Sequence, residues 1–294
     1  MNKTNIDVVD APQTVLGEAP MWSVGEQALY WVDVVGRCIF RLQHATGQID
    51  VCSLPYAPSM AIPRSTGGLL LITKKGMALL NFELGELTSL PVPLIDFSKE
   101  VFNDAKCDSA GRLWVGTRDI EVKEPHGGLF RLDSDFSMHR CGSGFTVSNG
   151  IAWAPNGRTM YHIDTHPGRI DAYDFDVAHG TISERRIFRD YHSVGASALP
   201  DGCTVDSEGG LWVAEVGDWH IRRYAPDGAL DREIRVPLQK PTSLMFGGPN
   251  LNTLYVTSMR FGLTEEQLAG QPLAGSLLQL DVGVRGLPET DFAG

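Results

Sequence analysis

The chain has few cysteines, and their arrangement suggests neither a cross-link nor a metal knuckle. Its 294 residues include five cysteines, an odd number, and no two of them form a Cys-x-x-Cys pair. Neither a disulfide framework nor a cysteine-based zinc site is therefore indicated. We expect most of these cysteines to serve as small buried hydrophobic side chains.

Long apolar runs are also absent. No segment approaches the roughly 20 apolar residues that a membrane-spanning helix needs. Residues 1–7 lack the apolar core of a secretory signal. We therefore expect a cytoplasmic protein that makes no contact with a membrane.

Positive charge is in deficit. The chain carries 25 Lys and Arg residues against 36 Asp and Glu residues, a formal net charge of −11. This balance would repel a nucleic-acid backbone or an anionic membrane surface. A small molecule is the partner that we expect, and a polyanionic ligand would need a cation to accompany it.

What the chain does contain is a short apolar pattern that recurs six times. Successive copies start 40 to 51 residues apart, and they occupy residues 29–33, 69–73, 113–117, 160–164, 211–215 and 254–258. Short β-type segments at this period are typical of a propeller, in which each repeat is one four-stranded blade. The sequence predicts an all-β, six-bladed β-propeller of antiparallel strands that forms a single domain over residues 1–294.

The flanking residues predict the order of strands within a blade. Each repeated segment follows an apolar stretch that opens with a polar residue, and a Gly-led strand such as 36–42 or 127–133 comes after it. The repeated segment is then the second strand of its blade. The last blade has a poor fourth strand, so we expect residues 6–9 to supply it, which would close the ring and cover an open edge.

The polar residues that open the first strands are expected to meet. Each lies 10 to 12 residues before its repeated segment, and the six are Glu18, Ser59, Asn103, Asn149, Asp201 and Thr242. The first strand of a propeller blade lines the central channel, so equivalent positions point at one another. Such an all-oxygen set favours a hard divalent cation, Ca²⁺ above all, with Fe²⁺, Zn²⁺, Mn²⁺ and Mg²⁺ also accommodated. The alternative is a ring of channel residues bonded to water.

Four longer segments carry a resemblance to a known family. They are Leu-Gly-Glu-Ala-Pro-Met-Trp at 16–22, Phe-Asn-Asp-Ala-Lys-Cys-Asp with Gly-Arg-Leu-Trp-Val-Gly-Thr at 102–108 and 111–117, Ser-Asn-Gly-Ile-Ala-Trp at 148–153, and Pro-Asp-Gly-Cys-Thr-Val-Asp at 200–206. Together they resemble the SMP-30/gluconolactonase/luciferin-regenerating-enzyme family of six-bladed propellers. The likeness spans four blades and runs over nearly the whole chain.

The resemblance implies a metal-dependent hydrolase. By analogy with the family, Glu18, Asn149 and Asp201 would hold one divalent ion, and the enzyme would open a lactone of an aldonic acid to the free acid. Asp201 would act as general base on a water molecule. Asn103 would contact the substrate and assist catalysis at the developing oxyanion.

Two positions bear on the substrate. Many members carry Arg just before the Phe-Asn-Asp run, where it contacts sugar hydroxyls, whereas this chain has Val101. Glu121 matches another polar contact of some members, in a segment that diverges from the family pattern. By resemblance the substrate-binding positions are Asn103, Glu121 and Val101, and the identity of the lactone stays open.

Other functions remain possible at this point. The same cage could serve a related hydrolase for a nitrile or an organophosphate, or a non-catalytic propeller that binds calcium. A serine nucleophile is disfavoured, because Cys-Gly-Ser-Gly at 141–144 lacks the strand-to-helix context of a nucleophile elbow. His166, His220 and Trp219 fall near the expected rim of the channel. For the assembly we expect a monomer or a weak homodimer.

Overall fold

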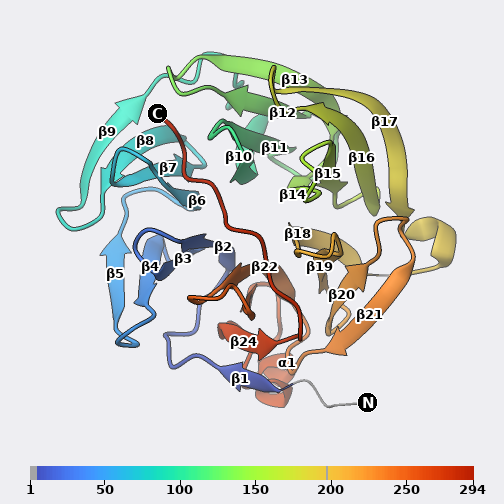
Figure 1. Ribbon diagram of the computed structural model, residues 1–294. Helices are drawn as coiled ribbons and strands as arrows, with labels where there is room; N and C mark the ends of the chain where they lie inside the picture. The colour runs from blue at the N-terminus through green and yellow to red at the C-terminus, as the bar shows by residue number, and fades with distance from the viewer. Residues whose placement is uncertain (1–4, 197) are drawn as a thin grey trace.

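The strands of the protein form six sheets around a central axis. The computed structural model describes residues 5–196 and 198–294, and nearly all of its regular structure is β-strand. Each sheet has four antiparallel strands, and the sheets are arranged as the blades of a ring (Figure 1). The six-bladed β-propeller that the repeats predict is confirmed.

Five blades are built from four consecutive strands each, in chain order. Blade 1 comprises β2 (Gly17–Ser23), β3 (Ala28–Asp33), β4 (Cys38–Gln43) and β5 (Ile49–Ser53); blade 2, β6 (Pro58–Pro63), β7 (Leu69–Thr73), β8 (Gly76–Asn81) and β9 (Glu86–Leu90); blade 3, β10 (Glu100–Cys107), β11 (Leu113–Asp119), β12 (Gly127–Leu132) and β13 (Met138–Phe145); blade 4, β14 (Ser148–Trp153), β15 (Thr159–Asp164), β16 (Arg169–Asp176) and β17 (Thr181–Asp190); blade 5, β18 (Leu199–Val205), β19 (Leu211–Val216), β20 (His220–Tyr224) and β21 (Leu230–Arg235).

Blade 6 joins the two ends of the chain. Its strands are β22 (Pro241–Gly247), β23 (Thr253–Ser258), β24 (Leu278–Asp281) and, on the outer edge, β1 (Ile6–Val8). β1 pairs antiparallel with β24, with Ile6 opposite Leu280 and Val8 opposite Leu278. The prediction that an N-terminal strand closes the ring is confirmed. This strand satisfies backbone groups of β24 that would otherwise form an open edge.

The repeated segments form the second strand of each blade and are almost wholly buried. Both faces of these strands are covered by neighbouring blades, which is why they read as continuous apolar runs rather than alternating ones. The core between blades also takes in the large side chains of Trp31, Trp114 and Trp212, each at most 1% exposed. Burial on both faces therefore accounts for the pattern seen in the sequence.

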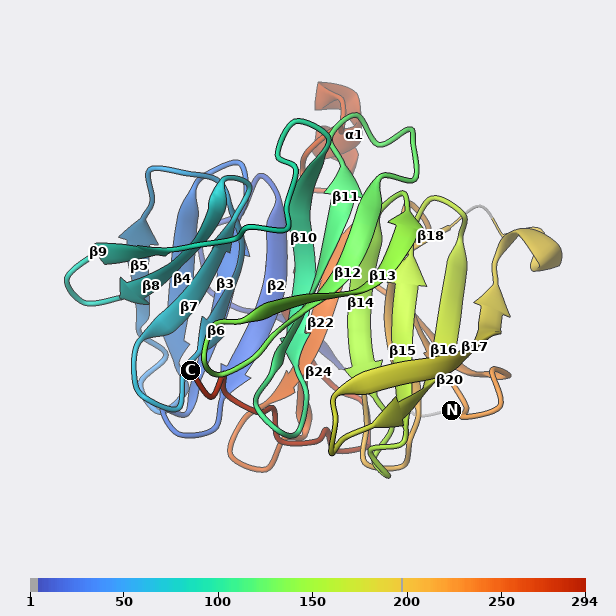
Figure 2. The same ribbon diagram turned by 90° about the horizontal axis from the view of Figure 1, so that it is seen from above.

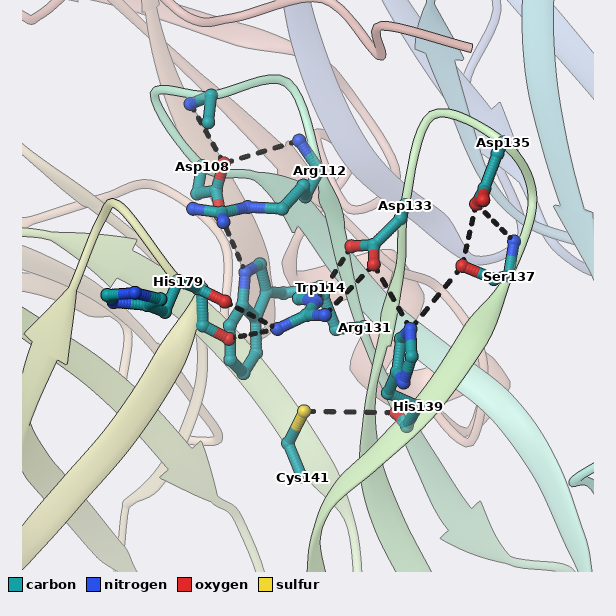
Figure 3. A network of polar contacts seen from close by, with 12 residues as sticks. Asp108, Arg112, Trp114, Arg131, Asp133, Asp135, Ser137, His139, Cys141 and His179 are labelled. Carbon is teal, nitrogen blue, oxygen red and sulfur yellow. Dashed lines mark hydrogen bonds and ion pairs between the residues drawn. The ribbon is translucent and has the colours of Figure 1, made fainter.

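Two of these tryptophans are held by an aspartate at the end of the preceding strand. Nε1 of Trp114 donates a 3.0 Å hydrogen bond to Asp108, which also accepts one of 2.8 Å from Nε of Arg112 (Figure 3). Nε1 of Trp212 donates to Asp206 at 2.7 Å in the same way. A buried indole N–H needs an acceptor, and the Asp-Ser-x-Gly turns supply it in both blades. The turn and the core strand are thus locked together.

The two ends of the channel differ. The C-terminal segment, residues 286–294, crosses one end of the ring (Figure 1) and forms bridges from Gly286 to Asp206 and from Phe292 to Arg64. Glu289 in this segment pairs with Lys106 at 3.0 Å. The short helix α1 (Glu265–Gly270) lies at the opposite end (Figure 2). The tail therefore covers one mouth of the channel and leaves the α1 end uncovered by this segment.

Helices contribute little to the molecule. Besides α1, the described residues contain one 3-10 turn, His192–Val194. None of the helices in that part of the chain has the length and apolar character that a membrane crossing requires.

Candidate active site

All six polar openers occupy the same place in their blades. The residue before each opener pairs with the last residue of the repeated segment, in the pairs Gly17–Asp33, Pro58–Thr73, Phe102–Thr117, Ser148–Asp164, Pro200–Glu215 and Pro241–Ser258. In every blade the register of the ladder shifts at or beside the opener. Such β-bulges change the direction of a side chain. The openers are therefore equivalent positions on six inner strands.

Small residues after the openers let the inner strands approach closely. A β-carbon on Gly150 would lie 2.8 Å from the carbonyl oxygen of Asp201, and one on Gly202 would clash with Oγ of Ser243. Only glycine leaves room for the neighbouring backbone at these two sites. The Asn-Gly and Asp-Gly pairs are thus explained by packing between blades, which brings Asn149 and Asp201 together.

Five of the openers line one cavity of about 390 Å³ at the α1 end of the channel, and four of these five are carboxyl or amide side chains. These four are Glu18, Asn103, Asn149 and Asp201, the residues singled out from the sequence for metal binding and catalysis. They come from blades 1, 3, 4 and 5. Side chains that are up to 183 positions apart in the sequence therefore share a single space, as the propeller symmetry predicts.

The other two openers have mainly structural contacts. Oγ1 of Thr242 is buried and donates a 2.6 Å hydrogen bond to the carbonyl oxygen of Gly17, and Thr242 does not line the cavity. Ser59 does line it, but its Oγ donates to the carbonyl oxygen of Phe102 at 3.0 Å. Of the six expected donors, five line the cavity, and the four carboxyl and amide side chains remain as candidate ligands.

A chain of hydrogen bonds orients the two amides. Nδ2 of Asn103 donates to Oδ1 of Asn149 at 2.6 Å and to the carbonyl oxygen of Ser148 at 3.0 Å. Nδ2 of Asn149 donates to Oγ1 of Thr165 at 2.7 Å, and this hydroxyl donates to the carbonyl oxygen of Pro200 at 2.7 Å. Oδ1 of Asn149 keeps a second lone pair for another partner.

The carboxyl groups of the cavity are strongly perturbed. Burial, followed by the negative charge of Asp104, raises the pKa of Glu18 from 4.5 to about 8. Burial and the charges of Glu18 and Asp104 raise the pKa of Asp201 well above its usual range. Burial likewise raises the pKa of Asp104 to about 6. Three buried carboxyl groups that repel one another require protons or a cation for stability.

The donor set fits a hard divalent ion. Glu18 and Asp201 offer carboxylate oxygens, Asn149 offers an amide oxygen, and no sulfur or imidazole is among them. Within residues 5–196 and 198–294 no group of three or more His, Cys, Asp and Glu side chains has the spacing of a metal cluster. Two carboxylates and one amide oxygen would instead leave coordination positions for water or substrate, as oxygen-binding ions allow.

Glu121 and Val101 lie outside the cavity lining. The side chain of Glu121 is exposed and pairs with Lys123 at 2.9 Å, because the turn that follows β11 directs it toward solvent. Val101 faces Arg118 across the β10–β11 ladder. Arg118, in contrast, does line the cavity. A guanidinium is thus supplied from the strand next to the position where family members carry Arg.

Of the three residues expected near the rim of the channel, only one lines the cavity. His166 lines the cavity, whereas His220 and Trp219 do not. Nδ1 of His220 lies 2.6 Å from the carbonyl oxygen of Asp218, and the guanidinium of Arg235 lies over the ring of Trp219. These local contacts account for both residues without a ligand.

Sequence reasoning missed Lys74 as a cavity residue, and it gave Arg118 no role beyond a place on the expected rim. Lys74 begins the two-residue turn between β7 and β8, and its Nζ donates to the carbonyl oxygen of Phe102 at 2.7 Å. A signal was present, since the connections between second and third strands all lie at the ligand end of the propeller. Burial and then the positive charge of Arg118 lower the pKa of Lys74 to about 7.

Comparisons with known proteins agree with this geometry. A family model described as the SMP-30/Gluconolactonase/LRE-like region matches residues 16–260, which include all four converging openers. The chain belongs to the SMP-30/gluconolactonase/LRE-like family. The resemblance seen in the sequence is therefore confirmed.

Full-length relatives exist within the SMP-30/gluconolactonase/LRE-like family. A 6-deoxy-6-sulfogluconolactonase from Pseudomonas putida is 35% identical over 297 residues, and regucalcin from Gallus gallus is 32% identical over 301 residues; each alignment covers 100% of both chains. The solved structure of a calcium-binding protein, regucalcin from Agrobacterium tumefaciens, is similar with a TM-score of 0.91 and 26% identity. It covers 98% of this chain and 97% of that chain.

Proposed function

We propose that the protein hydrolyses a sugar-derived lactone to the free aldonic acid with the help of one divalent metal ion. The observation that supports this most directly is the single cavity lined by Glu18, Asn103, Asn149 and Asp201. The relative from Pseudomonas putida, named as a sulfogluconolactonase, supports a lactone as the substrate. Calcium is the ion that we favour, because the donors are all oxygen and two relatives are regucalcins.

The ion would be held by Glu18, Asn149 and Asp201. When bound, it supplies Lewis-acid polarisation of the lactone carbonyl. Asp201 orients an attacking water molecule and takes its proton, as a buried carboxylate that lines the cavity can do. Glu18 contributes a second carboxylate from blade 1.

The hydrogen bonds of Asn103 favour a positioning role over direct contact with the oxyanion. Both hydrogens of its Nδ2 are engaged, one by Asn149 and one by the carbonyl oxygen of Ser148. Neither remains for an oxyanion in this arrangement. We therefore assign Asn103 as a positioning residue that holds the Asn149 amide in place.

Variants of the acidic residues test the proposal. Wild-type protein supplied with Ca²⁺ is expected to hydrolyse aldonolactones, measured as acid release. Asp201→Asn should reduce kcat by about 10²- to 10⁴-fold, the range for loss of a general base, and Glu18→Gln should reduce it through loss of a metal-binding carboxylate. Removal of the metal with a chelator should have a similar effect. Asn156→Ala, an amide change in an exposed turn, serves as the control.

The regucalcin names favour a second candidate, a calcium-binding propeller without catalysis. Isothermal titration with Ca²⁺ alongside the lactone assay separates the two. Calcium binding that depends on Glu18 and Asp201, with no turnover on a panel of five- and six-membered lactones, would replace the lactonase by the calcium-binding protein. Unchanged hydrolysis by the metal-free protein would refute the metal-dependent mechanism.

A further inference from the structure

The cavity contains two positive side chains that the proposed hydrolysis does not use. Lys74 enters from the β7–β8 turn of blade 2, and Arg118 lies on β11 of blade 3. Both belong to the arc of the ring between Glu18 in blade 1 and Asn149 in blade 4. They therefore lie beside the metal-binding set within one space.

Within the described residues neither cation forms an ion pair, although the negative charges of Glu18, Asp104 and Asp201 act on Lys74 from a greater distance. In the part of the chain that the structure describes, no Asp or Glu oxygen lies within ion-pair distance of Lys74 or Arg118. Their partners are neutral: Nζ of Lys74 donates to the carbonyl oxygen of Phe102 at 2.7 Å and lies 3.3 Å from Oδ1 of Asn103. One of the three ammonium hydrogens is left over.

Arg118 has spare donors as well. Its Nη1 donates to the carbonyl oxygens of Asp119 at 2.8 Å and Ile120 at 3.0 Å. Among the described residues neither Nε nor Nη2 donates a hydrogen bond to the protein. Arg118 is also partly desolvated, since burial lowers its pKa. A guanidinium with free donors in a recess is suited to bind an oxyanion by two parallel hydrogen bonds.

The balance of charge in the cavity also favours an anionic ligand. A divalent ion would neutralise the carboxylates of Glu18 and Asp201. Asp104 then offsets one of the two cations, and one positive charge is left over in a recess partly shielded from water. Leaving such a charge unpaired is costly, so the recess favours a ligand that carries negative charge. The chain as a whole carries a net charge of −11, which makes a positive recess a local feature.

We propose that the substrate is a lactone bearing an anionic substituent, a carboxylate, sulfonate or phosphate, which Lys74 and Arg118 bind. This inference rests on the proposed lactonase function. The ring carbonyl would face Glu18, Asn149 and Asp201, and the anionic group would face blades 2 and 3. Lys74 and Arg118 are then specificity-determining residues, and they take the place of the arginine that is absent at Val101.

The experiment compares neutral and anionic lactones of matched ring size. D-Gluconolactone is the neutral member, and its derivatives with carboxylate, sulfonate or phosphate at C6 are the anionic ones. For wild type we expect kcat/KM to be about 10- to 100-fold higher for at least one anionic lactone, mainly through a lower KM, as expected for a desolvated charge-assisted contact. Comparison of the three anionic lactones shows which anionic group the site binds best.

Variants assign the preference to the two residues. Lys74→Met and Arg118→Met should each reduce the ratio of kcat/KM for anionic over neutral lactones, and the double variant should bring it to about one. Arg118→Lys should recover part of the preference, because it restores the charge. Lys75→Met, an exposed change in the same turn, should keep the wild-type ratio. A ratio is used because it does not depend on the amount of folded enzyme.

The outcomes separate three failures. Equal kcat/KM for neutral and anionic lactones in wild type would overturn the anion-binding role and leave the lactonase intact. A preference for anionic lactones that survives in the double variant would overturn the assignment to Lys74 and Arg118. Absence of turnover on every lactone would overturn the proposed function itself, and the substrate class with it.

Discussion

Asn103 and Asn149 link two neighbouring blades through a 2.6 Å hydrogen bond from Nδ2 of the first to Oδ1 of the second. The bond spans the gap between β10 and β14 and turns the amide oxygen of Asn149 in a defined direction. Because both hydrogens of the Asn103 amide are used, the pair acts as a brace for the proposed metal-binding set.

Removal of the hydrogen bond between Asn103 and Asn149 should weaken metal binding more than it lowers the stability of the fold. In Asn103→Ala, Oδ1 of Asn149 loses its donor and the amide is free to rotate. We expect the Kd for Ca²⁺ to rise about tenfold, equivalent to about 1.4 kcal/mol for a hydrogen bond of this kind. Isothermal titration measures the change, with Asn156→Ala as the matched control. Unaltered calcium affinity would show that Asn103 does not position Asn149.

His162 should make the protein sensitive to acid. Burial, then the charges of Arg185 and Arg169, lowers its pKa from 6.5 to about 3. Between these two values the unfolded chain binds one proton that the folded chain does not, so stability falls as the pH drops. The slope is about 1.4 kcal/mol per pH unit once the unfolded imidazole is charged.

A glutamine in place of His162 should remove this contribution. The variant can keep the contact with Oγ of Ser148, which lies 2.6 Å from Nε2 of His162. Urea unfolding from pH 7 to pH 4 should give a free energy that falls less steeply for His162→Gln than for wild type. His179→Gln, at an exposed site, should follow the wild-type curve. Parallel curves for all three proteins would rule out the role of His162.

The ion pair between Lys106 and Glu289 should stabilise the C-terminal segment, residues 286–294. Nζ of Lys106 and Oε1 of Glu289 are 3.0 Å apart, and their side chains are only 7% and 13% exposed. Glu289→Ala would leave the ammonium unpaired in a buried place, and we expect a loss of about 3 kcal/mol in urea unfolding. Lys106→Met combined with Glu289→Leu should recover most of it. A double variant as unstable as the single one would mean that the tail is held by other contacts.

Gly150 should tolerate no side chain. A methyl group there would lie 2.7 Å from Sγ of Cys203 and 2.8 Å from the carbonyl oxygen of Asp201, so strands β14 and β18 would have to separate. We expect Gly150→Ala to cost about 1 to 3 kcal/mol of stability. It should also lower lactone hydrolysis through displacement of Asp201. Gly25→Ala, with open space around the added methyl, is the control in thermal unfolding and in the assay.

Much of the architecture could be read from the sequence because the repeats are physical units. Each apolar segment of five residues must be covered on both faces, and a ring of six such segments covers all of them. The equivalence of the openers followed from the same symmetry, since a fixed spacing from a core strand becomes a fixed position along the channel. Glu18, Asn149 and Asp201 could therefore be placed together from spacing alone.

The remainder of the site depends on directions that spacing does not encode. Lys74 and Arg118 reach the cavity from a turn and from a second strand, whereas Glu121, only three residues beyond Arg118, faces solvent beside Lys123. Whether a rim side chain points inward is decided by bulges, turn geometry and nearby charges.

The sequence by itself determined the ring of blades, its closure by the first strand, and the convergence of acidic and amide side chains, because these follow from periodic burial. Only the tertiary structure decided that both amide hydrogens of Asn103 are engaged, that the C-terminal tail covers one mouth, and that two cations without an ion-pair partner among the described residues share the cavity. Those features arise from contacts between side chains and backbone groups of different blades, whose geometry exists only once the ring has closed.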